Sequence, residues 1–403
     1  MSTRGQVCTW IAAVGLLMPS MGVCQDRTER EVVDLVVRDG PQARAIRAAS
    51  EVTRREQLAR LAYPNPVVTY SREGAGFTEF LQAEQSLPLF GARAALSRAG
   101  VAATAAAEAE RDLRLWLLRS DAAAAVARVV AEQTRLESAR AQVGVVERLI
   151  EILRTREREG EGSRFDRLRA EQELRDTHQL VTAATVALTE ARATLAGLLP
   201  REVSLASVTS APWSGQMPAP AETLFTRAAS TRADLRALQQ LRERATFEAE
   251  AARRARLPSP TLFGGMKRAD DPAGRETGGV FGLSVALPLF DSGRREAARW
   301  EAERARVEAE RASIEDRIRS EIAGASEVLA VRQTALAQDQ QGAAEELVQI
   351  AEVAYREGEA GILELLDAVR TAARARTRSI DLRLDARLAQ IALERAVGDT
   401  LWP

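Results

Sequence analysis

Hydrophobic positions alternate with small or polar ones in two short segments of the chain, residues 80–89 and 280–289. Alternation with a period of two sends successive side chains to opposite faces and predicts a β-strand. One face of each strand would be mostly apolar: Leu81, Ala83, Gln85, Leu87 and Leu89 in the first, and Phe281, Leu283, Val285, Leu287 and Leu289 in the second.

Each alternating segment is preceded by a second run of strand-forming residues, at 67–73 and at 261–267. Glycine-containing turns, at 74–76 and 270–279, separate the two runs of each pair. Two strands joined by a turn form a hairpin. The sequence therefore predicts two β-hairpins, 67–89 and 261–289.

Residues 92–157 and 294–357 contain no proline and are rich in Ala, Arg, Glu and Leu, the composition of long helices. Each tract ends at an acidic glycine turn, after which a second helix is predicted to return, at 165–198 and at 362–397. In the second tract, hydrophobic residues recur at every seventh position, which is the coiled-coil period. These residues are Ile322, Leu329, Leu336, Ala343 and Ile350.

Shorter helices are expected before each hairpin. In residues 28–62, two helical segments meet at Asp39-Gly40-Pro41, where Gly and Pro end one helix and start the next. The counterpart in the second half is a single helix within 221–257. These helices would extend the returning ones end to end, so that each half has one continuous and one composite helical column.

The chain repeats itself. Leu87-Pro88-Leu89-Phe90 recurs at 287–290, in the same position between hairpin and long helix. The halves, 25–199 and 221–403, are therefore interpreted as a tandem duplication of about 180 residues. Residues 200–220 contain several prolines and are expected to form a linker or a small equatorial segment.

The N-terminus has the features of an export signal. Arg4 precedes an apolar stretch at 7–23, so residues 1–24 are expected to be a signal peptide, with a retained membrane anchor as the alternative. Cys24 is a candidate lipidation site, although Val23 occupies a position where a small residue is expected.

Composition argues against several classes of function. With 56 basic and 57 acidic residues, no overall field favours nucleic acid. His178 is the only histidine, which excludes His-based triads and multi-histidine metal sites. Gly264-Gly265 and Gly278-Gly279 lack the sequence of a phosphate loop. We therefore expect no enzyme activity, no cofactor, no metal site and no nucleic-acid partner.

After the signal, no segment reaches the roughly 18 apolar residues of a membrane-spanning helix. A membrane form would have to use the strands, and four strands cannot close a barrel, so it would require an oligomer. Two alternatives remain open: hairpins that cap a helical bundle, and a soluble periplasmic coiled-coil scaffold or adaptor-like protein.

The chain resembles the TolC family of outer-membrane efflux proteins, in particular the cation-efflux branch. The resemblance depends on several motifs, on their order along the chain and on their repetition in the two halves. The first-half motifs are Tyr63-Pro64-Asn65-Pro66 and the segment from Gln85 to Arg93. In the second half, they are Phe290-Asp291-Ser292-Gly293-Arg294 and the turn Tyr355-Arg356-Glu357-Gly358 followed by Leu363-Glu364-Leu365-Leu366-Asp367-Ala368.

The resemblance implies an α+β membrane protein in the outer membrane of a Gram-negative bacterium, extending into the periplasm. Long coiled-coil helices would form a trimeric α-barrel, and four strands per chain would form a trimeric, twelve-stranded β-barrel in outer-membrane lipid. It further implies a homotrimeric, passive exit duct of a tripartite efflux or type I secretion system. Its partners would be a periplasmic adaptor (membrane fusion) protein and an inner-membrane pump of RND or ABC type.

The resemblance also implies a periplasmic gate at Tyr355, Glu364 and Asp367, with Asp166 and Arg169 as possible partners from the first half. Glu364 and Asp367 are three residues apart and would share one helix face. Family members often have an arginine two residues after the glycine of this turn, where this chain has Ala360, so the closing contacts are expected to differ. The glycine turns at Gly160 and Gly358 would form the tip that contacts the adaptor.

Overall fold

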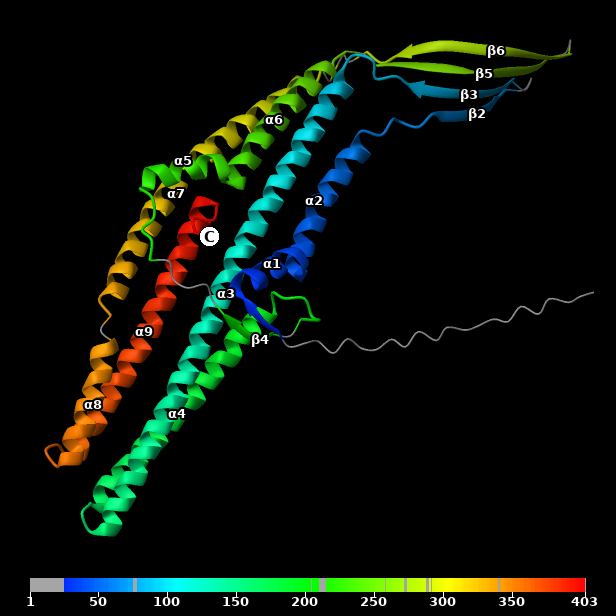
Figure 1. The fold of residues 1–403 in the computed structure, drawn as a ribbon. Coiled ribbons are helices and arrows are strands. Elements are labelled where there is room, and N and C mark those ends of the chain that lie inside the picture. Colours follow the sequence, from blue (N-terminus) through cyan, green and yellow to red (C-terminus); the bar gives the residue numbers. More distant parts are fainter. Residues whose placement is uncertain are drawn as a thin grey trace, which may run out of the picture.

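A computed structural model describes residues 25–74, 78–203, 205–209, 215–257, 259–271, 274–287, 290, 292–339 and 341–402. The expected signal peptide and Cys24 lie outside these residues. The molecule is elongated: a layer of long helices lies side by side, and a small sheet extends beyond one end of it (Figure 1).

The sheet has four antiparallel strands in the order β2-β3-β5-β6. Their bounds are β2 Val67–Glu73, β3 Thr78–Ser86, β5 Pro260–Asp271 and β6 Gly274–Val285. Each hairpin lies where the alternation predicts it, and the β3–β5 pairing joins the two halves of the chain in one sheet.

The strand lengths differ from the prediction. β3 ends at Ser86 rather than residue 89, since Leu87 donates a last backbone hydrogen bond of 2.8 Å to the carbonyl of Pro260 and Pro88 has no N–H. β5 and β6 run through most of the predicted 270–279 turn. Its glycines belong to the strand, where the ring of Phe281 lies against Gly279.

Helix α3, Ala92–Glu159, runs through the centre of the helical layer. Its 68 residues make it about 100 Å long. Near the sheet it packs against α2 and α6, and towards the far end against α4 and α9. The flanking helices are α2 Pro41–Arg60, α4 Arg164–Ala196, α6 Ala233–Arg254, α7 Arg294–Ala337, α8 Gln341–Glu357 and α9 Ile362–Val397.

The predicted helix 294–357 is wrong in one respect: it is two helices, because α7 ends at Ala337 and α8 begins at Gln341. The seven-residue seam is buried only in α7, where Ile322 and Leu329 are at most 1% exposed, whereas Ile350 in α8 is 59% exposed. A seven-residue repeat of hydrophobic residues shows that one face of a helix packs against another helix. It does not show whether that helix belongs to the same chain.

The single helix expected at 221–257 is also interrupted. Helix α5, Ala221–Thr231, stops at Arg232, whose backbone is extended, and α6 begins with the next residue. The buried Arg232 guanidinium donates to Asp234 at 2.6 Å and to the carbonyl of Ala396 at 2.7 Å. These contacts give the buried arginine its partners and hold the bend against the end of α9.

A small equatorial element lies beside α3. Helix α1, Glu29–Asp39, begins with a capping box between Thr28 and Glu31, and α2 follows it directly. The preceding strand β1, Gln25–Thr28, pairs in parallel with β4, Leu205–Thr209. The expected linker 200–220 therefore contributes a strand. Among the described residues, no helix is both long enough and apolar enough to cross a bilayer.

Candidate functional site

The far end of the helical layer consists of two glycine turns. Gly160, between α3 and α4, has φ 80°, and Gly358, after α8, has φ 77°, a left-handed conformation that glycine adopts without strain. Both residues are exposed, and no atom lies within 4 Å of where a Cβ would be placed. The turns expected to contact an adaptor therefore form an open tip.

Tyr355 is a core residue of this tip. It is only 8% exposed and belongs to a cluster that includes Leu153 of α3 and Leu366 of α9. The Arg156 guanidinium lies 5.2 Å from the centre of its ring. Arg156 also donates a 3.0 Å hydrogen bond to the carbonyl of Arg356, close to the end of α8. Burial raises the pKa of the Tyr355 phenol, and Arg156 partly offsets this effect.

Glu364 and Asp367 lie on the exposed side of α9, whereas the intervening Leu365 and Leu366 are buried. Within the described part of the chain, no hydrogen bond or ion pair involves Glu364, and Asp367 has only an electrostatic interaction with Arg370. Both carboxylates are therefore exposed on the surface of α9. Tyr355 does not share their exposed surface.

The expected partners from the first half do not meet Asp367 within one chain. Asp166 is half-buried near the Tyr355 phenol, and the Arg169 guanidinium lies 6.0 Å from the ring centre of Phe165. A contact between Asp367 and Arg169 would have to form between subunits.

One ionic contact near the tip, between Arg370 and Glu173, is not suggested by the sequence. Nε of Arg370 in α9 donates to Glu173 of α4 at 2.8 Å, and a second nitrogen of the same guanidinium binds the same carboxylate. The Glu173 side chain is 6% exposed and that of Arg370 is 42% exposed. The only available signal was the position of Arg370 one helical turn after Asp367, and it does not identify a partner 197 residues away.

At the other end of the molecule, the strand register divides the sheet into two sides. One side, here called the apolar side, comprises Val68, Tyr70, Leu81, Ala83, Leu262, Met266, Phe281 and Leu283. The opposite side mixes polar and apolar residues, among them Thr69, Ser71, Gln82, Glu84, Lys267 and Ser284. Both hairpins thus turn their apolar faces to the same side.

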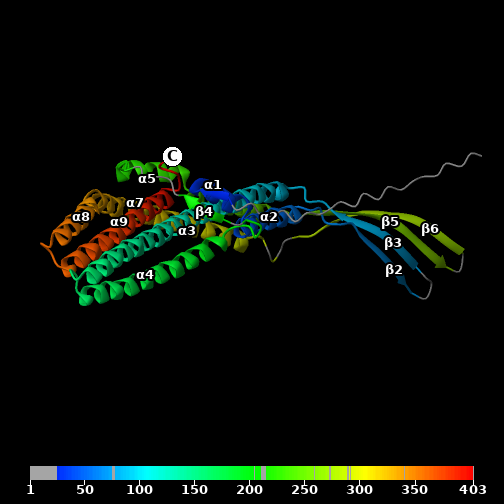
Figure 2. The same cartoon turned by 60° about the horizontal axis from the view of Figure 1, so that its bottom comes forward.

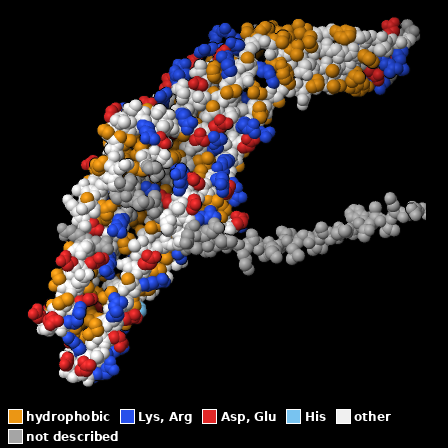
Figure 3. Space-filling view, viewed as in Figure 1, with side chains coloured by type: hydrophobic (Ala, Val, Ile, Leu, Met, Phe, Trp, Pro, Cys, Tyr) orange, Lys and Arg blue, Asp and Glu red, His pale blue; other side chains and the backbone are white. Residues whose placement is uncertain are grey.

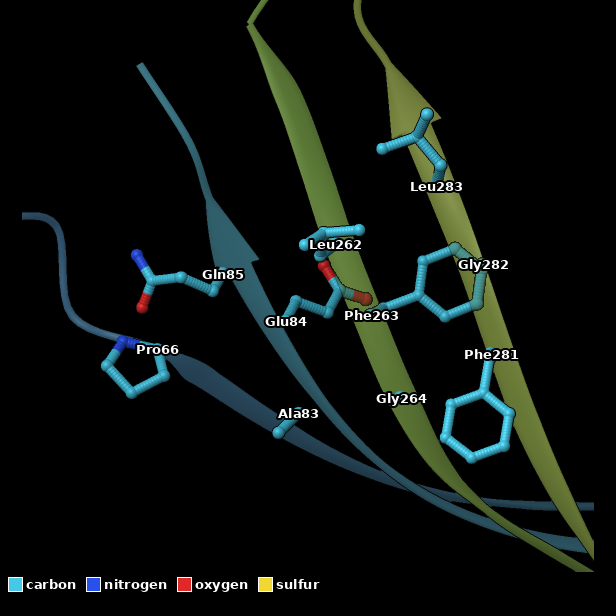
Figure 4. A pocket seen from close by; sticks show the side chains of 10 residues that line it. All are labelled: Pro66, Ala83, Glu84, Gln85, Leu262, Phe263, Gly264, Phe281, Gly282 and Leu283. Carbon is cyan, nitrogen blue, oxygen red and sulfur yellow. The ribbon is translucent and has the colours of Figure 1, made fainter. Parts of the chain in front are cut away.

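Glycines and phenylalanines fit together on both sides of this sheet, at a shallow depression that runs across β3, β5 and β6 (Figure 4). On one side, the Phe281 ring lies over Gly264, where a Cβ would be 3.3 Å from Cδ1 of the ring. On the other side, a Cβ at Gly282 would lie 2.1 Å from Cζ of Phe263. The small residues leave room for these rings against neighbouring strands.

Among the described residues, no group of three or more His, Cys, Asp or Glu side chains is placed to hold a metal ion. The tip instead exposes carboxylates, and the sheet at the other end of the molecule exposes an apolar face.

Comparisons with known proteins agree with this arrangement. Residues 224–399 match the family model of outer membrane efflux proteins. No curated protein matches the sequence. The fold resembles the open state of the MtrE outer membrane channel of Neisseria gonorrhoeae, with a TM-score of 0.76 and 20% identity, over 93% of this chain and 89% of that one.

Two further structures have the same fold. CusC, described as forming a transmembrane channel, has a TM-score of 0.75 and 19% identity, over 92% of each chain. The outer membrane protein VceC of Vibrio cholerae has a TM-score of 0.70 and 19% identity, over 93% of this chain and 97% of that one. Residues 224–399 are thus similar to the outer membrane efflux protein family, and nearly all of the chain has a fold similar to that of the outer-membrane channels MtrE and CusC.

Proposed function

We propose that three copies of this chain form a passive exit duct of a tripartite efflux or type I secretion system. The sheet would contribute to a barrel in the outer membrane of a Gram-negative bacterium, and the helices would form a tunnel through the periplasm. A periplasmic adaptor protein and an inner-membrane pump of RND or ABC type would deliver the substrate. The observation that carries the proposal is an apolar sheet with two open edges.

The edges are strands β2 and β6, each of which has only one neighbour in the described sheet. The apolar side of the sheet is strongly exposed: Val68 is 68%, Phe281 85% and Leu283 59% exposed. An apolar face of this kind is suited to lipid, but unpaired backbone groups at an edge within lipid cost several kcal/mol each. Further copies of the chain would satisfy both edges, and three copies of four strands give twelve.

The helical layer has matching edges. Figure 2 shows α4 and α8 at opposite edges, with α3 and α9 between them. α4 packs mainly on α3, and α8 mainly on α9. Both edge helices expose large apolar side chains: Phe165, Leu168 and Leu180 on α4, and Leu347, Ile350 and Val353 on α8. Head-to-tail association would bury both surfaces and close a ring.

At the tip, Glu364 and Asp367 would face the lumen as a ring of carboxylates, which raises the local concentration of cations. Tyr355 would stabilise the tip as a core residue, because it packs α8 and α9 against α3. Asp166 and Arg169 would meet the neighbouring subunit. The turns at Gly160 and Gly358 would contact the adaptor.

The runner-up function, a soluble periplasmic scaffold, is disfavoured by the same sheet. A scaffold in water would gain nothing from a contiguous apolar face on a projecting hairpin pair, because such a surface promotes aggregation.

The first test is the mass and conductance of the detergent-purified chain. We expect light scattering to give three times the mass of the chain without its signal peptide, and ion conductance after insertion into planar bilayers. A strictly monomeric protein that does not conduct would refute the proposal.

The second test concerns the carboxylate ring. In a KCl gradient, we expect Glu364→Gln combined with Asp367→Asn to shift the reversal potential towards lower cation preference. Glu79→Gln combined with Asp270→Asn is the matched control, because it removes the same number and type of charges on the apolar side of the sheet, outside the proposed pore. Equal shifts in both variants would remove Glu364 and Asp367 from the pore lining.

A further inference from the structure

Charged side chains gather at the far end of the apolar side of the sheet. Arg72, Glu79, Arg268 and Thr277 form one row across the four strands, and Asp270 pairs with Arg275 two residues further along. Along each strand, these residues lie an even number of positions from the apolar residues, so their side chains project to the same side of the sheet. We call the three arginines Arg72, Arg268 and Arg275, together with Glu79 and Asp270, the arginine rim.

The members of the arginine rim form one electrostatic group. Glu79 lies 4.0 Å from both Arg72 and Arg268. Arg275 donates to Asp270 from Nε at 2.6 Å and from Nη2 at 3.1 Å. Arg72 and Arg268 also interact electrostatically with Asp270. Three positive and two negative charges leave a net charge of +1 per chain.

Arg268 and Arg275 keep unused hydrogen-bonding capacity. A guanidinium has five N–H donors, and Arg275 uses two on Asp270. The side chains of Arg72, Arg268 and Arg275 are 50%, 44% and 59% exposed. Asp270 holds the Arg275 guanidinium in position, and the exposed side chains of Arg268 and Arg275 retain N–H groups for a planar, bidentate contact with an oxyanion.

The depth of the rim corresponds to a lipid headgroup. Met266, the last apolar residue of β5 on this side, is followed two positions later by Arg268. The row of Pro260 and Val285 lies eight residues from the row of Arg268 and Thr277. Eight residues span about 27 Å along a strand, or about 20 Å across the membrane at a tilt of about 40°. Figure 3 shows hydrophobic side chains along the sheet and charged ones at its far end.

We propose that the arginine rim binds phosphate groups of lipids in the outer leaflet of the outer membrane. The inference rests on the proposed function, which places the far end of the sheet away from the periplasmic helices and hence in that leaflet. A phosphate-bearing headgroup matches the rim in charge, in depth and in its bidentate acceptor geometry. Zwitterionic headgroups such as phosphatidylcholine, whose phosphate already has an ammonium group as counter-charge, would leave the net positive charge of the rim unpaired.

The chain contains a matched control for this site. Lys267 precedes Arg268 in sequence but lies on the opposite side of β5, where its ammonium is 5.4 Å from the centre of the Phe80 ring. Arg268→Gln and Lys267→Gln each remove one positive charge from adjacent positions of the same strand. Only the first changes the surface that faces lipid.

The experiment uses the full chain in phosphatidylcholine nanodiscs doped with lipid A and measures bound lipid A by native mass spectrometry. We expect Arg268→Gln to weaken lipid A binding about fivefold. The combined Arg72→Gln, Arg268→Gln and Arg275→Gln variant should lose it, and Lys267→Gln should retain it. Dephosphorylated lipid A should bind the wild type as weakly as lipid A binds the triple variant.

Two results would overturn the assignment: equal binding by Arg268→Gln and Lys267→Gln, or displacement of lipid A by millimolar inorganic phosphate, which would indicate a site for the free ion. Conductance of the same preparations in planar bilayers separates this inference from the proposed function. If the protein conducts but its binding of lipid A does not depend on the arginine rim, only the proposal of lipid binding by the rim is refuted. A protein that neither inserts nor conducts refutes both.

Discussion

The ion pair between Arg370 and Glu173 offers the sharpest test of how the tip is held together. It joins α9 to α4. These two helices otherwise have few direct contacts with each other, because each packs against α3. The perturbation is Arg370→Met, which approximates the aliphatic stem of the side chain and removes the guanidinium group with its charge. The carboxylate of Glu173 then loses the only hydrogen-bond partners described for it.

The magnitude follows from the burial of the two groups. Leaving one partner of a fully buried pair uncompensated costs about 3–5 kcal/mol. Glu173 is 6% exposed, but Arg370 is 42% exposed, so water can enter the vacated position and solvate the carboxylate in part. We therefore expect a cost of about 2 kcal/mol for opening of the tip, which is roughly a 30-fold loss of exchange protection.

The assay is amide hydrogen exchange of the purified protein, because it measures local opening without global unfolding. Protection should fall around Glu173 in α4 and around Arg370 in α9, while the middle of α3 remains unchanged. A double-mutant cycle with Glu173→Gln should give a coupling energy of about 1–2 kcal/mol. Glu173→Gln alone should cost less, because the exposed Arg370 can be solvated.

Arg154→Met is the matched control. Arg154 is 49% exposed and pairs with Glu151, which is 68% exposed, and with Glu171 of α4. Such exposed pairs contribute about 0–1 kcal/mol. If Arg154→Met and Arg370→Met reduce protection equally, or if the cycle shows no coupling, the reasoning from burial is wrong.

Three further predictions concern other parts of the chain. Tyr355→Ala should cost about 3 kcal/mol by leaving a cavity, seen as lost exchange protection at the tip; a change below about 1 kcal/mol would contradict its core position. Burial raises the pKa of the Glu394 carboxyl, so the folded chain binds this proton more tightly than the unfolded chain, and stability is lost as the pH rises from the ordinary carboxyl range through the raised value. Glu394→Gln should therefore match the wild-type melting temperature at pH 4 and exceed it at pH 7; a difference that does not change with pH would argue against the shift. Gly282→Val should lower the free energy of unfolding, measured by urea denaturation, by about 1–3 kcal/mol through its clash with Phe263, whereas Gly278→Ala, with open space around it, should not, and equal effects would refute the packing argument.

The hairpins could be predicted because alternation is a local property of the chain. The lengths of β5 and β6 could not, because Gly278 and Gly279 have the composition of a turn. In the sheet, a Cβ at Gly279 would lie 3.1 Å from the Phe281 ring, so the ring covers the glycine and keeps it in the strand. The packing of the Phe281 side chain, and not the glycine itself, therefore accounts for the extended conformation of Gly279.

The tip was predictable to a similar extent. The glycine turns at Gly160 and Gly358 and the shared face of Glu364 and Asp367 follow from local spacing. The burial of Tyr355 and the Arg370–Glu173 pair do not, since both depend on how helices from different halves of the chain pack against one another.

By itself, the sequence determined that this protein has two similar halves, each with a hairpin, a long helix and a glycine turn, because period, proline and glycine act over a few residues. Only the tertiary structure decided that β3 pairs with β5, that both apolar faces lie on one side, and that the arginine rim continues that side. Strand register and helix packing couple residues about 200 positions apart, and no local pattern records which partner yields the lower free energy.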